Sequence, residues 1–503
     1  MKLKYFCLSL LLGSSLTFTG CTSWLDEDVY SQLGNGTVAN SSNAIERVLF
    51  EAYRNAQFHG NFGGNIEYHE EWTCDQFWET GGAVNNHASV MLQFTWDASY
   101  PDHAVNLWNQ CYRSIRNCNL VLELIDGSTL PDDEKTRIKS EARFIRAIVY
   151  YKLYMRSGGV PLRLKSEGEQ ALARATDEEM KTFIETELSE VAPLLPDRGE
   201  LSSYQYGRAT RGAAYGFLCK FYLNTKQWAK CAQAAQEVMD LEFGYELWPD
   251  YNTLFTVDNK MTNKEFIWAF TCSTQTDGCE IINGWFPADF KRVQTNTAVG
   301  EIVFTSNMRN WARMDRIYDS FYNSFDPKDK RKDLIITEYE NTKGNTVSLL
   351  NDNNTRMFKY VPDPNAVENA HGNDIPVIRY ADILLSRAEA LNELNGPTQD
   401  IFDNLIQPVR DRAGLTDKLY ASDFTKETLR DFLLKERGWE FYGENLRRQD
   451  LLRHGKFIEQ AKERQKIGKP FEIKAIIDDH FKLFPIPQTE IDANPLCEQN
   501  PGY

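Results

Sequence analysis

ATRGAAYGFLCKFYLNTKQWAKCAQAAQEVMD, residues 209–240, carries the clearest fold signal in the chain. Small and apolar side chains recur at steps of three and four residues on both sides of the polar run 224–227, at Ala213, Phe217 and Phe221 and then at Ala232, Ala235 and Met239. This spacing places side chains on one face of an α-helix. Two antiparallel helices in a stretch of roughly 34 residues form the unit of a tetratricopeptide-like array. The segment therefore predicts a helical scaffold.

Two further segments show the same helical period. Apolar side chains repeat over residues 138–153, and the pattern stops at Gly158-Gly159. They repeat again over 381–391, before Gly396, which suits the left-handed cap of a helix. Residues 57–105 and 244–375 are less regular, with Gly-, Asn- and Asp-rich loops and short strand-like runs such as 265–270. We therefore predict helices that carry long loops, and such loops usually carry function.

Residues 1–20 have the features of a secretory signal peptide, because two lysines precede a short apolar run at 5–12. That run is shorter than the roughly 18 apolar residues that span a membrane. Residues 17–21, Thr-Phe-Thr-Gly-Cys, resemble a bacterial lipobox, with Phe18 in place of the usual leucine. This predicts cleavage before Cys21 and acylation of that cysteine, whose buried acyl chains would anchor the protein. A plain secreted protein with a chance cysteine is the alternative.

Three acids follow the predicted lipidation site, at Asp26, Glu27 and Asp28. They resemble the export tag that sends lipoproteins of some Gram-negative bacteria to the outer face of the outer membrane. A solvated charged linker would have the same composition, and the two interpretations are compatible. We expect a lipid-anchored protein exposed at the cell surface.

The charge balance excludes one class of partner. The chain has 56 Lys+Arg and 72 Asp+Glu, and without Lys2 and Lys4 the net charge is −18. Proteins bind nucleic acid by neutralising phosphates with lysine and arginine. So acidic a chain, with no basic cluster beyond Arg447-Arg448, is a poor candidate for nucleic-acid binding.

The cysteines and histidines show no metal-binding pattern. No two cysteines have the C-x-x-C spacing, and the seven histidines are scattered. Cys272 and Cys279 flank a predicted turn and could form a local disulfide. The Asp- and Asn-rich residues 351–375 could hold a calcium ion, but loops of this composition are usually solvated. We predict no metal site and no cofactor.

Short motifs occur in a characteristic order along the whole chain. They are Trp24-Leu-Asp26, Trp108-Asn-Gln-Cys-Tyr112, Glu141-Ala-Arg-Phe-Ile-Arg-Ala147, Gly158-Gly-Val-Pro-Leu162, Gly207-Arg-Ala-Thr-Arg-Gly-Ala-Ala214, Ile378-Arg-Tyr-Ala-Asp382, Arg410-Asp-Arg-Ala-Gly-Leu415, Lys435-Glu-Arg-Gly-Trp-Glu440, Asp450-Leu-Leu-Arg-His-Gly455, Leu483-Phe-Pro-Ile-Pro-Gln488 and Gln499-Asn-Pro-Gly-Tyr503. Each motif alone is weak. In this order the chain resembles the SusD/RagB outer-membrane nutrient-binding lipoproteins from end to end.

The resemblance implies a mostly α-helical fold, in which four tetratricopeptide-like helix pairs pack against an irregular, loop-rich ligand-binding half. It implies a single unit over residues 21–503, with an N-terminal region 21–240 and a C-terminal region 241–503. It also implies a partner, a SusC-like TonB-dependent outer-membrane transporter. The lipoprotein would cover the mouth of this transporter and deliver oligosaccharide or polysaccharide nutrient to it.

Three glutamates invite an enzymatic interpretation. Glu436, Glu440 and Glu444 follow one another at four-residue steps, which on a helix places Cβ atoms about 5–6 Å apart. Retaining glycosidases hold two carboxyl groups about 5–5.5 Å apart. Those groups flank the scissile bond, however, whereas these would lie side by side on one helix face with arginines nearby. The chain has no nucleophile-elbow, Walker or Rossmann motif, so we predict a binding protein and no enzyme.

A glycan binder needs aromatic faces to stack on sugar rings and planar polar groups to pair with hydroxyls. Tryptophan suits the first task because it offers a large contact area at little cost in rotamer entropy. We therefore looked for tryptophans in polar loops, and expect the ligand to contact Trp78, Trp96, Trp285 and Trp311, with Asn85, Asn86 and Arg309. Ordinary core packing is the alternative for each tryptophan.

Two other functions remain open. Some members of the family resemble peptide or glycopeptide binders of the RagB type, and aromatic side chains serve both kinds of ligand. The acidic balance favours neutral glycans or basic peptides over acidic polysaccharides. Alternatively, the protein is a structural lid of the transporter without ligand selectivity of its own.

Overall fold

The computed structural model describes residues 42–57, 59–60, 64–79, 85–100, 105–168, 171–311, 315–466 and 475–503. Cys21, the three acids after it and the predicted signal peptide lie outside these residues. The lipid anchor and the division of the chain into 1–20, 21–240 and 241–503 therefore stay predictions.

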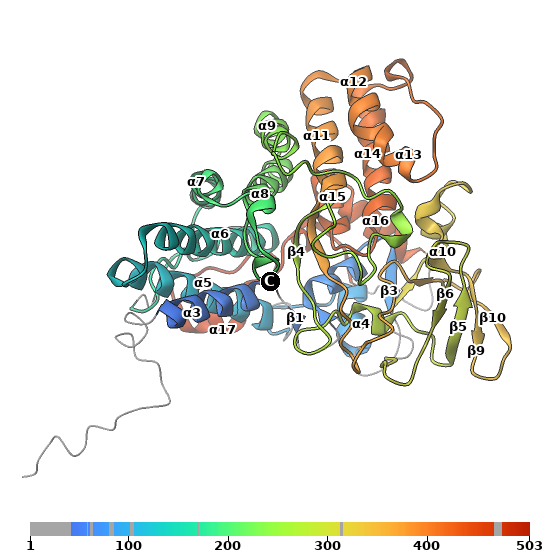
Figure 1. Ribbon diagram of the computed structural model, residues 1–503, viewed down its shortest axis with the longest axis horizontal. Coiled ribbons are helices and arrows are strands. Elements are labelled where there is room, and N and C mark those ends of the chain that lie inside the picture. Colours follow the sequence, from blue (N-terminus) through green and yellow to red (C-terminus); the bar gives the residue numbers. More distant parts are fainter. Residues whose placement is uncertain are drawn as a thin grey trace, which may run out of the picture.

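The helices form an array in which each one packs against the next (Figure 1). In order they are α3 (Ser42–Ala56), α5 (Leu107–Leu124), α6 (Asp132–Ser157), α7 (Asp177–Val191), α8 (Arg211–Asn224), α9 (Trp228–Met239), α11 (Tyr380–Asn395) and α14 (Lys426–Phe441). The helical segments expected around 138–153, 209–240 and 381–391 are all present. A mostly α-helical fold of this type is confirmed.

The hairpin of α8 and α9 shows why its sequence folds in this way. The Thr210 hydroxyl caps α8 by accepting a hydrogen bond from the backbone N–H of Ala213 at 3.1 Å. Lys226 turns the chain with a φ of 59°. Small residues let the helices approach their neighbours, and a Cβ at Gly216 would lie only 3.2 Å from the side chain of Ile378.

Shorter helices occupy the rest of the described chain. They are α4 (Asn85–Gln93), α10 (Asp319–Tyr322), α12 (Gln399–Ile401), α13 (Gln407–Arg412), α15 (Arg447–Arg453), α16 (Phe457–Gln465) and α17 (Gln488–Ala493). A π-helical turn at Phe402–Ile406 joins α12 to α13, and its apolar side chains form a separate core with α11 and α14. Among the described residues, none of the helices combines the length and the apolar character that a membrane span requires.

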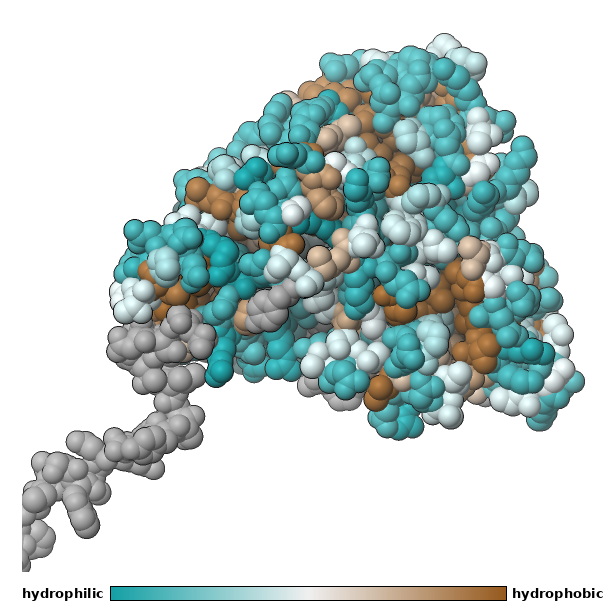
Figure 2. Space-filling model, in the orientation of Figure 1, coloured by the Kyte–Doolittle hydropathy of each residue, from teal (hydrophilic) through white to brown (hydrophobic). Residues whose placement is uncertain are grey.

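The strands form small antiparallel sheets beside the helices, and the largest sheet lies at the lower right of Figure 1. The largest has the order β10-β9-β5-β6, with β5 (Phe290–Gln294), β6 (Glu301–Val303), β9 (Glu338–Asn341) and β10 (Thr346–Ser348). The pairs are β1 (His59–Gly60) with β2 (Gly64–Asn65), β3 (Phe77–Glu79) with β7 (Asp315–Ile317), β8 (Ile335–Ile336) with β11 (Arg356–Met357), and β4 (Phe266–Phe270) with β12 (Ile375–Arg379). The strand expected at 265–270 is therefore present as β4. Figure 2 shows a mostly hydrophilic face with separate apolar patches, one of them over the region of β5 and β6.

The local disulfide that Cys272 and Cys279 could form is not present in the structure, where both are free, buried thiols. The backbone of each cysteine bonds to the segment 371–374. The Cys272 N–H donates to Asp374 Oδ1 at 3.0 Å, and the Cys279 N–H donates to the carbonyl of His371 at 2.8 Å. The turn between them closes through the backbone, since the Ser273 N–H donates to the carbonyl of Asp277 at 3.0 Å.

Candidate ligand-binding surface

Two loops meet at the protein surface and are joined through their backbones. The N–H of Glu368 donates to the carbonyl of Asn307 at 2.8 Å, and the N–H of Arg309 donates to the carbonyl of Glu368 at 3.0 Å. The side chains of Arg309 and Glu368 form an ion pair at 2.7 Å although both are more than half exposed. The loops at 305–311 and 363–371 thus form one platform whose rim is polar.

Trp311 is the aromatic side chain of this platform. Its ring is half-buried, and its indole N–H donates to Asn369 Oδ1 at 3.1 Å. Its backbone N–H donates to the carbonyl of Asn283 at 3.1 Å. The ring is therefore held at its edge, while part of it stays accessible. We call Asn307, Arg309, Trp311, Val367, Glu368 and Asn369 the Trp311 surface.

The Trp311 surface combines the groups that a sugar or a peptide requires. Val367 adds an apolar side chain that is 49% exposed. Amide and charged groups of Asn307, Arg309 and Glu368 surround it and are exposed to solvent. Flat apolar contact within a polar rim is typical of sites that bind neutral, hydroxyl-rich ligands, because the rim pairs with hydroxyls while the ring covers apolar C–H faces.

A buried polar network supports this surface from below. The Asn283 side-chain amide donates to the carbonyl of Asn369 at 2.8 Å, and its oxygen lies 3.2 Å from His371 Nε2. His371 Nδ1 accepts a hydrogen bond from the N–H of Asp363 at 3.1 Å. His371 must therefore carry its proton on Nε2. Burial lowers the pKa of His371 to about 4, although the charge of Asp363 acts in the opposite direction.

We expect acid to loosen the loops that carry the Trp311 surface. An unfolded histidine takes up a proton near pH 6.5 and the folded His371 only near pH 4, so the unfolded state binds more protons between these values. The contribution of His371 to stability is complete above pH 6.5 and falls by on the order of 3 kcal/mol as the pH drops to about 4. Long-range ¹⁵N spectra across this range would report the pKa and the tautomer of His371. A midpoint near 6.5, or a proton on Nδ1, would contradict the network.

Trp78 and Trp285 lie close to the Trp311 surface but beneath it. Trp285 follows the short turn that contains Asn283 and contacts the ring of Phe77 edge-on at 5.4 Å. Trp78 is only 2% exposed, stacks on Tyr318 at 6.4 Å and lies under the guanidinium of Arg316 at 4.5 Å. Tertiary contacts cover both rings, which favours ordinary core packing over the predicted ligand contact at Trp78 and Trp285.

Trp96 packs in the core near the C-terminal residues, which again favours the alternative of core packing over the predicted ligand contact. Its ring is 3% exposed and packs against Phe94, Phe481 and Phe484, with centroids 4.9–5.2 Å away. Its indole N–H donates to the hydroxyl of Tyr503 at 2.8 Å. Trp96 therefore attaches the C-terminal residues to the core. Asn85 and Asn86 begin helix α4, and their side chains are outside the described part of the structure.

Sequence reasoning missed part of the Trp311 surface and its support, namely Asn283, Val367, Glu368, Asn369 and His371. The segment 351–375 drew notice only as a calcium-binding composition. The tight turn around Glu368, which has a φ of 55°, is visible only in the structure. In the described residues no cluster of three or more acidic, histidine or cysteine side chains is arranged to hold a metal ion.

The three glutamates at four-residue steps form part of a buried ion network. Glu440 accepts hydrogen bonds from Arg379 at 2.6 Å, from Arg331 at 3.2 Å and from Arg412. Despite its burial, these guanidinium groups hold the pKa of Glu440 far below its usual range. Glu436 pairs with Arg331 and Arg410, and Glu444 pairs with Lys359 and Arg379. A carboxylate kept ionised and enclosed in this way cannot serve as a general acid for glycoside cleavage.

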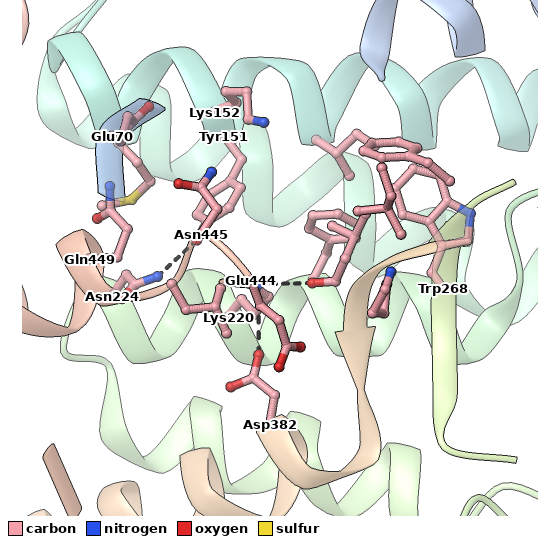
Figure 3. Close-up of a pocket in the computed structure, with 18 of the residues that line it drawn as sticks. Glu70, Tyr151, Lys152, Lys220, Asn224, Trp268, Asp382, Glu444, Asn445 and Gln449 are labelled. Atoms are coloured by element: carbon pink, nitrogen blue, oxygen red, sulfur yellow. Dashed lines mark hydrogen bonds and ion pairs between the residues drawn. The ribbon is translucent and has the colours of Figure 1, made fainter. Parts of the chain in front are cut away.

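An internal cavity of about 120 Å³ lies where the helical array meets the strands (Figure 3). It is lined by Tyr151 and Lys152 from α6 and by Lys220 and Asn224 from α8. Burial lowers the pKa of both lysines. The ammonium of Lys220 donates to the carbonyl of Val377 at 3.0 Å and lies 3.7 Å from Asp382. Lys220 of α8 thereby links the helical array to β12 and α11. The space is large enough for several water molecules.

The chain is similar to known proteins in sequence and in fold. A family model described as the SusD family matches residues 264–503, and one described as starch-binding and associating with the outer membrane matches residues 23–223. The chain is 22% identical to SusD-like protein P25 of Formosa agariphila over 96% of both chains. It is 24% identical to the starch-binding protein SusD of Bacteroides thetaiotaomicron over 77% of this chain and 76% of that protein.

Solved structures show the same fold. A laminarin-binding SusD-like protein superposes with a TM-score of 0.76 at 22% identity and covers 92% of this chain and 100% of its own. Surface glycan-binding protein A from Bacteroides thetaiotaomicron, in complex with laminarihexaose, has a TM-score of 0.72 at 20% identity. It covers 91% of this chain and 99% of its own.

Proposed function

The chain belongs to the SusD family, and from this membership we propose that it binds oligosaccharide or polysaccharide nutrient at the outer membrane. Relatives that are named for binding starch or laminarin, and a neighbour that holds laminarihexaose, support a glycan as the ligand class. The name of the matching N-terminal family model supports association with the outer membrane. The protein acts by binding and carries out no reaction on its ligand.

The observation that carries this proposal is the half-buried ring of Trp311 on a polar platform. Two hydrogen bonds hold the residue, one from its indole N–H and one from its backbone N–H, so the ring loses little freedom when a ligand stacks on it. The exposed Arg309–Glu368 pair of the same platform is available to meet hydroxyl groups. The platform is preorganised, because backbone hydrogen bonds already join its two loops.

Location and partner complete the proposal. The lipobox-like residues 17–21 support acylation of Cys21, which would keep the protein on the outer membrane with its ligand surface exposed. Family membership supports delivery of the glycan to a SusC-like TonB-dependent transporter. The fold supports this arrangement, because a rigid helical array can contact a transporter while the Trp311 surface remains open.

We expect Trp311→Ala to weaken glycan binding about 10- to 100-fold. Removing a buried aromatic anchor from a binding site typically costs about 1.5–3 kcal/mol, and every 1.4 kcal/mol is tenfold in affinity. Residues 22–503 would be titrated by calorimetry against neutral plant glycans, mucin glycans and casein-derived peptides. Trp228→Ala is the matched control, because Trp228 is also half-buried but lies at the start of α9 in the helical array.

The outcomes of this titration separate the possible functions. Saturable binding of one glycan class that Trp311→Ala weakens and Trp228→Ala leaves unchanged would support the proposal. Binding of peptides alone would favour a peptide or glycopeptide binder. If a Trp311→Ala strain retained full growth on the bound glycan, the protein would act as a structural lid, and if affinity were unchanged, the site would be misplaced.

A further inference from the structure

A groove of about 490 Å³ runs along helix α5, on a different part of the molecule from the Trp311 surface. One wall consists of α5 side chains, among them the half-buried ring of Tyr112. The other wall is the segment 163–168, held to α5 because the Asn119 amide donates to the carbonyls of Arg163 and Lys165 at 3.0 and 3.1 Å. Glu490 of α17 closes one side. We call this feature the α5 groove.

The α5 groove is basic although the chain as a whole is acidic. Four cationic side chains line it, against two carboxylates: Arg113, Arg116, Arg163 and Lys165 against Glu167 and Glu490. Glu490 lies 3.1 Å from Arg163, and Glu167 lies 3.4 Å from Arg116 in a pair that is more than half exposed. Arg113 and Lys165 are exposed and form no ion pair with any residue that the structure describes. The groove therefore retains positive charge that an anionic partner would neutralise.

The chain itself contains a partner of matching chemistry. Trp24-Leu-Asp-Glu-Asp-Val-Tyr30 has three consecutive acids between aromatic side chains, and it lies outside the described residues. Carboxylates pair with arginine in a bidentate geometry, and arginine also stacks on aromatic rings. The acids at 26–28 match the cations of the α5 groove, and the aromatic residues at 24 and 30 match its apolar floor.

The connection is long enough and starts at the correct end of α5. Helix α3 runs antiparallel to α5, because Arg137 in the first turns of α6 lies 3.5 Å from Glu46 while Ser114 in α5 contacts Ala52. Ser42 is thus near the end of α5 where the N–H of Ser166 donates to Glu123 at 2.8 Å. The 12 residues from Tyr30 to Ser42 can span roughly 40 Å, whereas the 18 residues of α5 are about 27 Å long.

We propose that residues 24–30 dock in the α5 groove of the same chain, with Asp26, Glu27 and Asp28 against Arg113, Arg116 and Lys165. The tether makes this contact intramolecular, and a short tether provides an effective concentration on the order of millimolar. A site that binds the free peptide only weakly is then mostly occupied. If Cys21 is acylated, docking holds the α5 side of the protein toward the membrane, since only a few residues separate Cys21 from the docked segment.

Hydrogen–deuterium exchange of residues 22–503 tests this inference. We expect the amides of 24–30 to exchange at least about tenfold more slowly than in an unstructured peptide. Arg113→Glu with Arg116→Glu should abolish that protection, and 0.5 M NaCl should weaken it, because salt screens exposed charges. The matched control is Lys343→Glu with Lys435→Glu, two exposed cations on the β9–β10 turn and on α14, and it should leave the protection unchanged.

A charge exchange makes the test specific to the pairing. Asp26→Lys, Glu27→Lys and Asp28→Lys should remove the protection and restore it when combined with Arg113→Glu and Arg116→Glu. A synthetic peptide of residues 22–30 should bind the variant that carries lysines at 26–28, because its groove is unchanged and unoccupied. The same peptide should not bind a variant that carries Arg113→Glu and Arg116→Glu. Unprotected amides in the unmodified chain would overturn the proposal, as would protection that survives reversal of the groove. Binding of a sulfated oligosaccharide by the groove beside an unprotected segment would also overturn it and assign the groove to an external anion.

Discussion

Glu440→Gln is expected to lower the free energy of unfolding by about 3–5 kcal/mol, the usual cost of removing one partner from a buried ion pair. Glu440 lies on α14 and is fully buried. Three guanidinium groups surround its carboxylate, those of Arg331, Arg379 and Arg412. Glutamine has the same shape, but its amide group brings two donors to a place where all neighbours are donors.

The remaining carboxylates cannot replace Glu440. In the variant, Arg379 would still pair with Glu265 and Glu444, and Arg331 with Asp329 and Glu436. Those acids already form these ion pairs in the unmodified protein, so they add no charge that could replace Glu440. The network would hold its arginines with one negative charge fewer in a medium where an unpaired charge is expensive. The loss of stability in Glu440→Gln therefore measures how much this ion network contributes to holding α14 against β12 and against the segment around Arg331.

The depressed pKa of Glu440 also predicts how the free energy of unfolding changes in acid. Its folded pKa is depressed, so its contribution to stability is complete above the unfolded value near 4.5 and is lost as the pH falls below that value. Glu440→Gln should therefore cost most at neutral pH and progressively less in acid. Urea unfolding followed by fluorescence at several pH values would measure both effects.

A matched control is available in β9. Glu338 is exposed and forms no ion pair with a described residue, so Glu338→Gln should change the free energy of unfolding by no more than about 0.5 kcal/mol. A loss below about 1 kcal/mol for Glu440→Gln would contradict the network as described here.

Gly159→Ala is the second substitution with a large expected effect, about 2–3 kcal/mol of lost stability. An added Cβ would lie 1.9 Å from the carbonyl oxygen of Ala175, a backbone atom that cannot move alone. The N–H of Ala175 donates to the carbonyl of Val160 at 3.0 Å, and Arg174 donates to the carbonyl of Gly159 at 2.6 Å. The new methyl group must therefore separate two segments that these hydrogen bonds hold together.

The consequences reach the C-terminal residues. Arg174 also donates to the carbonyl of Ser157 at 2.9 Å and to Asn500 Oδ1 at 2.7 Å. We therefore expect Gly159→Ala to increase hydrogen exchange around residue 500 as well as in the segment 157–175. Gly127→Ala is the control, because no atom lies within 4 Å of a Cβ at that position. It should be neutral or slightly stabilising, and equal effects of the two substitutions would contradict the steric argument.

Local patterns in the sequence were sufficient for the scaffold. The helical periods of 138–153, 209–240 and 381–391 appear in the structure as α6, α8, α9 and α11, and Gly158 and Gly396 end α6 and α11. Helices can be recognised in this way because neighbours at three and four residues share a face whatever the tertiary fold. The ordered motifs extended the prediction to the family, which the comparisons confirm.

The ligand surface could be predicted only in part. Arg309 and Trp311 were recognised from tryptophans in polar loops, and the structure places them on one platform. The same rule failed for exposure at Trp78, Trp96 and Trp285, since each of these also stands in a polar or glycine-rich context but is covered by distant residues. Asn353 accepts the indole hydrogen bond of Trp78 across 275 positions of sequence, and Tyr503 that of Trp96 across 407.

The amino-acid sequence by itself determined the helical array, the family and the acidic character of the chain, because these depend on spacing between near neighbours and on composition. Only the tertiary structure decided which aromatic rings remain accessible, which acids lie in the ion network around Glu440, and that Cys272 and Cys279 are free thiols. Burial and pairing are set by segments hundreds of residues away. No local sequence pattern indicates which of those distant segments will pack against a given side chain.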